Sequence, residues 1–322
     1  MENKIIASIS ICGEMILNLH SLNNEGSEGN QTMPRQLTIF NKDGEDKTVT
    51  GISGDMFKHI NVEHLVNYCT ENNLSLSNYS KKMDPNRISV KELKEEVGKL
   101  ANNQEDVINA LIKKCVVCDT HGVLITEAVG GSENTSRKSV IEFAWTVGIP
   151  GKNNTETYIH TKLVANVGKK SNETTASNEG QNLFYRPANH GAYAFICNID
   201  VYRIGLNDIT RTYAIEDEER INRYKAILLS LLSTILNPKG AMTSMQKPHI
   251  TNFQGVVTVS HKLLPSPTIS AINPNYINEL EVIKENLNKI QKGAIEIKAF
   301  DNLGGLSEII AELFLCTPYK IQ

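Results

Sequence analysis

The stretch that most restricts the fold of this chain is residues 50–59, TGISGDMFKH, where strand-like sequence gives way to a helical apolar spacing. Ser53 stands where a helix N-cap would be, and the apolar spacing begins at Met56. The first N–H groups of a helix are unpaired and carry partial positive charge, so a phosphate can bind there, beside Lys58 and His59. The alternative is an ordinary capped surface helix with the Lys58 and His59 side chains in solvent, and it explains the same residues equally well. No Walker loop or G-x-G-x-x-G follows a strand here, which argues against a nucleotide triphosphatase.

The composition is typical of a globular protein, with 322 residues, 40% hydrophobic and 21% charged. No apolar run approaches the ~18 residues that cross a bilayer, and the N-terminus leads directly into strand-like sequence. We therefore expect a cytoplasmic protein. The six cysteines stand mostly alone in apolar segments, which favours buried, reduced thiols over a disulfide framework.

Cys115 and Cys118 have the C-x-x-C spacing of half a zinc site or of a redox pair. No second pair accompanies them, and His121 is the nearest further ligand candidate. Both thiols also lie in residues 115–125, a segment that we expect to be a strand. The pattern favours structural cysteines, and we expect neither a metal nor a cofactor.

The formal net charge is −3, which alone argues against a nucleic-acid binder, but the charge is segregated. Residues 220–278 contain no Asp or Glu and six basic residues: Arg220, Arg223, Lys225, Lys239, Lys247 and Lys262. A globally acidic chain can therefore present a basic groove to a polyanion.

Strand and helix patterns mix without a regular βαβ repeat, which predicts an α+β fold. Helical periodicity is clearest in residues 89–101, 104–114, 217–236, 274–291 and 305–315. Strands are expected at residues 4–19, 37–40, 47–50, 140–149, 190–205, 256–264 and 295–300, besides 115–125.

Residues 151–190 have the pattern of a long β-hairpin. Tyr158, His160 and Lys162 alternate with residues of the opposite face, residues 168–180 are polar, and strand-like sequence resumes at residues 182–186. A polar tip of this kind buries little apolar surface, so we expect it to be mobile and to contact a partner.

Residues 135–139, around Arg137, form a basic, hydroxyl-rich segment before a strand. Such a segment is suited to gripping a phosphodiester, although an ordinary hairpin turn explains it as well. A catalytic constellation is not evident, because G-x-S-x-G and H-x-x-x-H are both missing. His160, His190 and His249 lie in or near basic regions and leave acid–base ribonuclease chemistry open. Phosphate binding by polar residues is the favoured interpretation.

The order and spacing of residues 21–25, 29–30, 34–36, 50–59 and 193–205 resemble the DevR-type autoregulator family. This is the backbone-subunit branch, the "Cas seven" superfamily, of type I CRISPR effector complexes, and the resemblance spans about residues 5 to 262. It implies one domain over residues 1–322: an RRM-like (ferredoxin-like) palm with a helical insertion at about 60–114 and a protruding β-hairpin thumb at 151–190.

The function implied by the resemblance is a non-catalytic subunit that binds CRISPR guide RNA (crRNA) and presents it for pairing with target DNA in antiviral defence. The implied partners are crRNA, target DNA through the guide, neighbouring copies in a helical homo-oligomer, and the Cas five-type, large and small subunits of a Cascade complex of subtype I-B or I-A. The alternative is a metal-independent endoribonuclease of repeat RNA that uses His249 or His160. A transcriptional autoregulator would need a duplex-reading helix, and none of the expected helices is basic along one face.

Carried over by position, the resemblance places several groups of residues beside the guide. The ordinary RRM aromatic pair is not evident, which favours holding of the RNA backbone over reading of bases. The basic segment at 135–139 adds Arg137 to the set. The RNA-binding residues expected are Asn23, Asn30, Arg35, Gln36, Ser53, Gly54, Met56, Lys58, His59, Arg137, Lys169, Lys170, Arg186, Lys239, Lys247 and His249.

Overall fold

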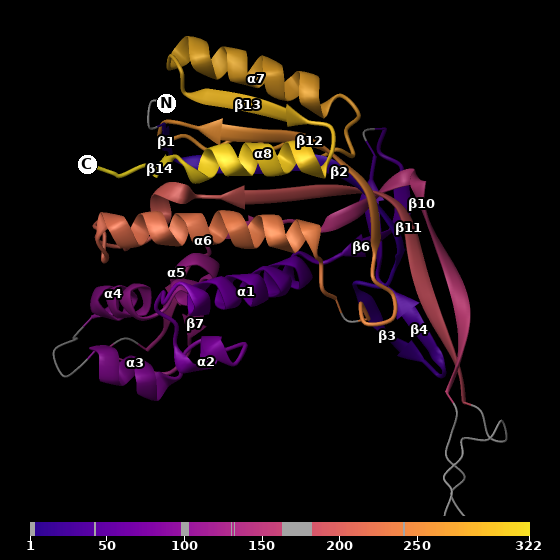
Figure 1. Cartoon of the computed structure of the whole chain (residues 1–322), viewed down its shortest axis with the longest axis horizontal. Coiled ribbons are helices and arrows are strands. Elements are labelled where there is room, and N and C mark those ends of the chain that lie inside the picture. Colours follow the sequence, from indigo (N-terminus) through magenta and orange to yellow (C-terminus); the bar gives the residue numbers. More distant parts are fainter. Residues whose placement is uncertain are drawn as a thin grey trace, which may run out of the picture.

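The computed structural model describes residues 4–41, 43–97, 103–129, 131, 133–162, 182–240 and 242–322. Its centre is one large sheet whose strands follow the order β13–β12–β2–β11–β10–β6–β5, each antiparallel to its neighbours (Figure 1). In chain order these are β2 (Ser8–His20), β5 (Gln36–Phe40), β6 (Asp46–Ile52), β10 (Thr146–Lys162), β11 (Asn182–Ile199), β12 (His249–Ser260) and β13 (Ile295–Phe300). The expected α+β class is confirmed.

Shorter strands surround this path. Three of them belong to the same sheet: β3 (Asn24–Glu28), β4 (Gln31–Pro34) and β9 (Ile141–Phe143). The others form two small ladders, β1 (Ile5–Ile6) with β14 (Thr317–Pro318), and β7 (Val123–Ile125) with β8 (Thr135–Arg137).

The palm is built from β2, α1 (Gly54–Glu71), β10, β11, α6 (Asp217–Leu236) and β12, in this chain order and with other elements inserted between them. Strand–helix–strand–strand–helix–strand is the succession of the ferredoxin-like motif. Helices α1, α6 and α8 (Leu303–Phe314) lie over one face of the sheet, while α7 (Tyr276–Ile290) and the segment before it cover part of the other. Among the described residues, no helix is long and apolar enough to cross a membrane.

Helix α6 forms where the periodicity predicts it. Its apolar stripe, with Tyr224, Leu228 and Leu231, is buried in the main core, and its first turn carries three acidic residues that suit the positive end of the helix dipole. Helix α1 and the sheet share a chain of aromatic rings. Phe195 packs edge to face on Phe57 at 5.5 Å between ring centroids and on Phe253 at 5.6 Å.

A second core lies in the helices that follow α1: α2 (Asn78–Lys81), α3 (Val90–Val97), α4 (Gln104–Lys114) and α5 (Val116–His121). The expected strand over residues 115–125 is wrong. Cys115 is the N-cap residue of the helix α5, which spans Val116–His121, and only Val123–Ile125 is a strand. Residues 115–121 are all buried, including the polar residues 119–121, so the segment has no exposed polar face whose period would separate a helix from a strand. All six cysteines are free thiols, and all except Cys316 are buried.

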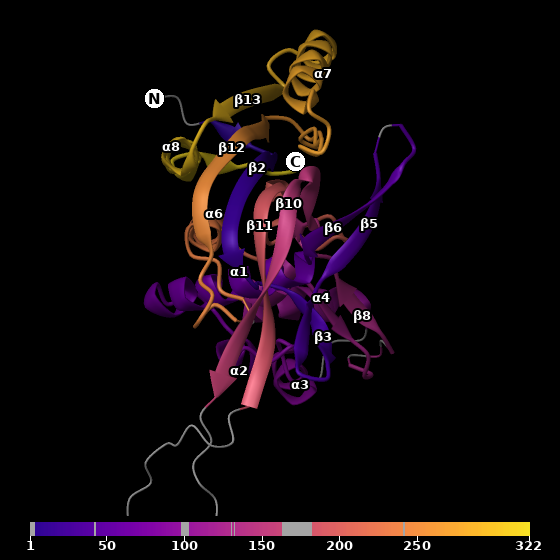
Figure 2. The same ribbon diagram turned by 90° about the vertical axis from the view of Figure 1, so that its right-hand side faces the viewer.

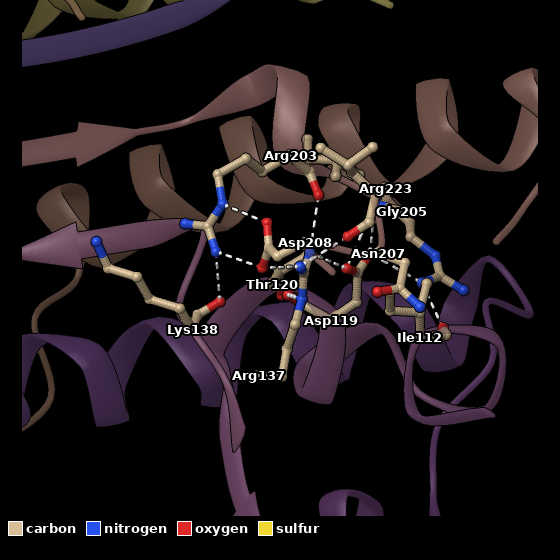
Figure 3. A network of polar contacts seen from close by, with 12 residues as sticks. Ile112, Asp119, Thr120, Arg137, Lys138, Arg203, Gly205, Asn207, Asp208 and Arg223 are labelled. Carbon is tan, nitrogen blue, oxygen red and sulfur yellow. Dashed lines mark hydrogen bonds and ion pairs between the residues drawn. The ribbon is translucent and has the colours of Figure 1, made fainter. Parts of the chain in front are cut away.

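A buried ion-pair network joins α5 to the palm (Figure 3). The Asp119 carboxylate accepts hydrogen bonds from Arg137 Nη2 at 2.8 Å, Arg223 Nη1 at 3.0 Å and the Gly205 backbone N–H at 3.0 Å. Oδ2 of Asp208 accepts hydrogen bonds from Arg203 Nη2 and from Arg137 Nη1, which links the two arginines. The network therefore fixes the inserted helices against α6 and the loop after β11.

The long hairpin is confirmed in its two arms. Strands β10 and β11 pair without interruption from Asn153↔Gly191 to Lys162↔Asn182, and their paired ends project beyond the body of the molecule (Figures 1 and 2). The expected tip, residues 168–180 with Lys169 and Lys170, lies outside the described residues.

Candidate nucleic-acid interface

The start of α1 is organised as the sequence predicts. Ser53 is the N-cap residue, and its Oγ accepts a hydrogen bond from the Met56 N–H at 3.2 Å. The Ser53 N–H donates in turn to Oδ1 of Asn23 at 2.8 Å. Asn23 is 8% exposed, so its side chain holds the loop after β2 against the helix start.

Gly54 has a packing role. A Cβ built on Gly54 would lie 2.2 Å from the carbonyl oxygen of Phe143 in β9, a distance that no side chain tolerates. The glycine is therefore explained by close approach of two backbones, before any contact with an anion is considered. Met56 follows it and packs against the main core.

The segment between α6 and β12 brings several predicted residues to the end of the sheet at which β2 ends and β12 begins. We call this end of the sheet the edge of the palm. Gly240 lies against the backbone of Leu22, with 2.8 Å between its built Cβ and Leu22 Cα. Arg186 of β11 approaches the sulfur of Met245 at 3.0 Å, and Gln246 Nε2 donates to the Pro187 carbonyl at 3.0 Å. The loop after β2, the base of the hairpin and residues 237–240 and 242–249 thus lie side by side, as Figure 1 also shows.

The cations of this segment are partly engaged within the protein. Lys239 pairs with Glu63 of α1 at 2.6 Å, and the exposed Lys247 donates to Oδ1 of Asn237. His249 is exposed at the first residue of β12, opposite Asn18. These three residues lie beside α1 and the sheet edge, and their contact with RNA stays a prediction.

Arg35 is the single residue between β4 and β5. Its guanidinium is 3.6 Å from Glu25 and 5.8 Å from the centroid of the Trp145 ring. Gln36 is exposed at the start of β5. The β3–β4 hairpin approaches β11 through Asn30, whose carbonyl oxygen accepts a hydrogen bond from the Tyr185 N–H at 2.9 Å.

Lys58 and His59 lie on α1 at a cavity of about 220 Å³ between this helix and the inserted helices. Burial lowers the pKa of Lys58, and the nearby Arg87 guanidinium lowers it further. Arg87 was not among the residues expected from the sequence. Its place depends on the loop after α2, and no local pattern marks it.

Arg137 requires a correction. Its guanidinium is fully buried and is bound to Asp119, Asp208 and the Arg203 carbonyl, so Arg137 is not available to a polyanion. Lys138 is the exposed basic side chain of residues 135–139. Arg220 and Arg223 of the acid-free segment are likewise buried, and each is engaged by carbonyl or carboxylate oxygens. Two of the six basic residues of residues 220–278 are therefore not available to a basic groove, so the charge count overstates its positive charge.

His160 and His249 belong to different parts of the interface. His160 is opposite Phe184 in the hairpin, and within the described part of the chain neither ring makes a hydrogen bond or ion pair with a carboxylate. Across the same described residues, no group of three His, Cys, Asp or Glu side chains is placed to hold a metal ion.

A buried histidine at the same edge was also not expected. His20, the last residue of β2, is 1% exposed and packs edge to face on Tyr193, with 5.2 Å between ring centroids. Burial lowers its pKa to about 3, and His190 contributes in the same direction. Its ring is therefore neutral at physiological pH and supplies no positive charge to the interface.

Comparison with known proteins identifies a family for most of the chain. The family model described as "CRISPR-associated negative auto-regulator DevR/Csa2" matches residues 11–281. No curated protein matches the sequence.

Solved structures with similar coordinates include two titled as a CRISPR RNA-guided surveillance complex. The pre-nicking one has 12% identity and a TM-score of 0.44, covering 98% of this chain and 96% of that chain. The second also has 12% identity, with a TM-score of 0.46 and coverages of 95% and 98%. The Csc2 crystal structure from Thermofilum pendens has 14% identity, a TM-score of 0.41 and coverages of 96% and 85%.

Proposed function

This chain belongs to the DevR/Csa2 family of CRISPR-associated proteins, and we propose that it is a non-catalytic subunit that binds guide RNA and polymerises along it. In this proposal the protein holds crRNA for pairing with target DNA, in a type I effector complex of subtype I-B or I-A. Its neighbours are further copies of itself and the Cas five-type, large and small subunits. Its expected location is the cytoplasm.

The observation that carries the proposal is the convergence of distant segments at the edge of the palm. The N-cap of α1, the loop that holds Asn23, residues 237–240 and 242–249 and the base of the projecting β10–β11 hairpin lie together there. Arg35, Arg186 and Lys247 supply positive charge along this edge. Such an arrangement suits contacts with the phosphate backbone, which give affinity without reading sequence.

The absence of catalysis is part of the proposal. Acid–base cleavage of RNA needs a general acid and a general base at the same ribose, and within the described residues neither His160 nor His249 pairs with a carboxylate that would orient its ring. The endoribonuclease is therefore the second candidate, and it makes a different prediction about the fate of the RNA.

The test is to incubate the purified protein with CRISPR repeat RNA and with an unrelated RNA of equal length. We expect similar affinities for both and intact RNA after incubation. Lys247→Ala should weaken binding to both RNAs, whereas Lys292→Ala, an exposed lysine after α7, should not. Discrete cleavage that disappears in His249→Ala or His160→Ala would overturn the scaffold proposal in favour of the nuclease.

A further inference from the structure

The cavity between α1 and the inserted helices contains two cationic side chains that face it from different elements. Lys58 comes from α1, whereas Arg87 comes from the loop between α2 and α3. We propose that this cavity binds one phosphate group of RNA between Lys58 and Arg87. The inference rests on the proposed function and adds the inserted helices to the RNA-binding surface.

Arg87 is held in place by its surroundings. Its φ of 62° lies in the left-handed region, which a non-glycine residue adopts rarely and at some cost. The Arg87 carbonyl accepts hydrogen bonds from Ser80 Oγ, at 2.8 Å, and from Ser77 Oγ, which explains why the conformation persists. The backbone of Arg87 is thereby fixed before any ligand binds.

Only part of the Arg87 guanidinium is used by the protein. Its Nη1 donates to the carbonyls of His121 and Gly122 at the end of α5. Within the described residues, Nε and Nη2 make no hydrogen bond to the protein. An arginine whose remaining N–H groups are free can donate to an anionic oxygen in fixed geometry.

Lys58 is partly buried and lacks a carboxylate partner. Among the described residues, no Asp or Glu lies within ion-pair distance of its ammonium, although Asp55 and Asp84 also line the cavity. Burial and the Arg87 charge both lower the Lys58 pKa, and the charges of Asp55 and Glu142 offset this only in part, so the two positive groups still repel each other. An anion between them would relieve this repulsion.

The size of the cavity selects the kind of anion. About 220 Å³ is below the roughly 300 Å³ at which pockets for small organic ligands begin. A phosphate group with bound water fits this space better than a whole nucleoside. Lys58 and the free edge of Arg87 provide the N–H donors that a phosphate oxygen accepts.

The first experiment measures the thermal stability of the protein as inorganic phosphate is added, at constant ionic strength. Phosphate should raise the melting temperature of the parent protein and should have no effect on Lys58→Met. The matched control is Lys225→Met, a half-buried lysine of α6 that lies near the Phe314 ring and away from the cavity. The control should respond as the parent does. An equal response of Lys58→Met and the parent would overturn the proposal.

The second experiment measures the affinity for short single-stranded RNA with and without a 5′-phosphate. Lys58→Met should lower the affinity about tenfold and reduce the slope of log K against log salt by about 0.7, the value for one phosphate contact on a single strand. If the loss occurs with both RNAs, the bound group is an internal phosphodiester; if it occurs only with the 5′-phosphorylated RNA, the group is the terminal phosphate. Arg87→Lys keeps the charge but loses the planar fork, and it should give an intermediate loss.

The outcomes separate this proposal from the general one. If Lys58→Met binds RNA and responds to phosphate as the parent protein does, the cavity is ruled out as a phosphate site. The proposed guide-binding function would not be affected by that result. Failure of the parent protein to bind RNA would eliminate the proposed function and, with it, the assignment of the phosphate to RNA.

Discussion

Gly54 shows how one residue can have two explanations at this interface. At the start of a helix, a glycine suggests close approach of a phosphate to the backbone. In the structure the space beside Gly54 is filled by the Phe143 carbonyl of β9. The residue is required where α1 meets the sheet, whether or not RNA is bound.

We expect Gly54→Ala to destabilise the protein by roughly 1–3 kcal/mol, as overpacking against a fixed neighbour does. The control is Gly305→Ala in the first turn of α8, where the new Cβ would make ordinary contacts at 3.4 Å or more. That change should be neutral or stabilising by up to about 1 kcal/mol, because alanine favours helix. Urea unfolding of both variants measures the difference, and equal stabilities would contradict the packing explanation.

Asp119 is the residue on which the buried arginines depend. It lies on α5, and its carboxylate accepts hydrogen bonds from Arg137 and Arg223, which come from β8 and α6. All three side chains are buried. Removal of this carboxylate would take away the one fully buried counter-charge that the two guanidinium groups share, and would leave Arg137 with Asp208 and Arg223 with Glu219, both partly exposed.

Asp119→Asn should therefore lower the free energy of unfolding by about 3–5 kcal/mol, the range found when one partner of a buried ion pair is removed. Asp217→Asn is the matched control, because the Asp217 carboxylate is exposed, pairs with Lys320 at the surface and contacts Arg220 only at 3.5 Å. Its effect should stay below about 1 kcal/mol. Chemical denaturation of the two variants provides the measurement, and a mild effect at Asp119 would show that the network adds little to stability.

At the scale of elements, the β10–β11 hairpin differs from the strands that it continues. Near the palm, residues 187–189 of the β11 arm are buried, and toward the end of the described arms large apolar side chains become exposed, with Ile159 at 61% and Leu183 at 42%. These two residues lie near each other on paired strands, since Ile159 is opposite Tyr185 and Leu183 is opposite Thr161. The arms thus carry apolar surface that the protomer itself does not cover.

Replacing residues 168–180 by a short glycine-containing turn should leave the melting temperature nearly unchanged, because this polar sequence contributes little apolar burial. It should impair regular assembly on RNA if the hairpin is a thumb that contacts the guide. Melting temperature and the size of the RNA-bound assembly are compared with those of the parent. Normal assembly would argue against the thumb, and a large fall in melting temperature would assign the segment to the core.

At the scale of the whole molecule, the two cores are joined by α1. Its buried residues contribute to both, with Phe57 in the palm core and Leu65 in the core of the inserted helices. The same helix starts at the loop with Asn23 and borders the cavity with Arg87. Contacts with RNA at the start of α1 would therefore be fixed relative to both parts of the protein.

A subunit that polymerises along a guide should bind RNA in numbers that grow with RNA length. We expect single-stranded RNAs of increasing length to bind one, two and then more copies, as measured by analytical ultracentrifugation. The sequence of the RNA should matter little, because the proposed contacts are with the phosphate backbone. One copy at every length would contradict polymerisation while leaving RNA binding possible.

The sequence by itself determined the elements whose pattern is local. The apolar stripe of α6, the N-cap at Ser53, the β5–β6 hairpin and the alternating arms of the β10–β11 hairpin all follow from neighbouring residues, and so does the α+β class. The DevR/Csa2 family was also accessible from motif order.

Only the tertiary structure decided which polar residues are available to a ligand. Charge alone made Arg137, Arg220 and Arg223 candidates for a basic surface, yet all three are buried among acceptors contributed by distant segments. Burial on every side likewise hid the helical nature of residues 116–121. Arg87 reached the cavity through contacts with Ser80 and His121, of which the latter is 34 residues away. Partners separated so far along the chain leave no local pattern, and therefore the use of a charged side chain is settled by packing.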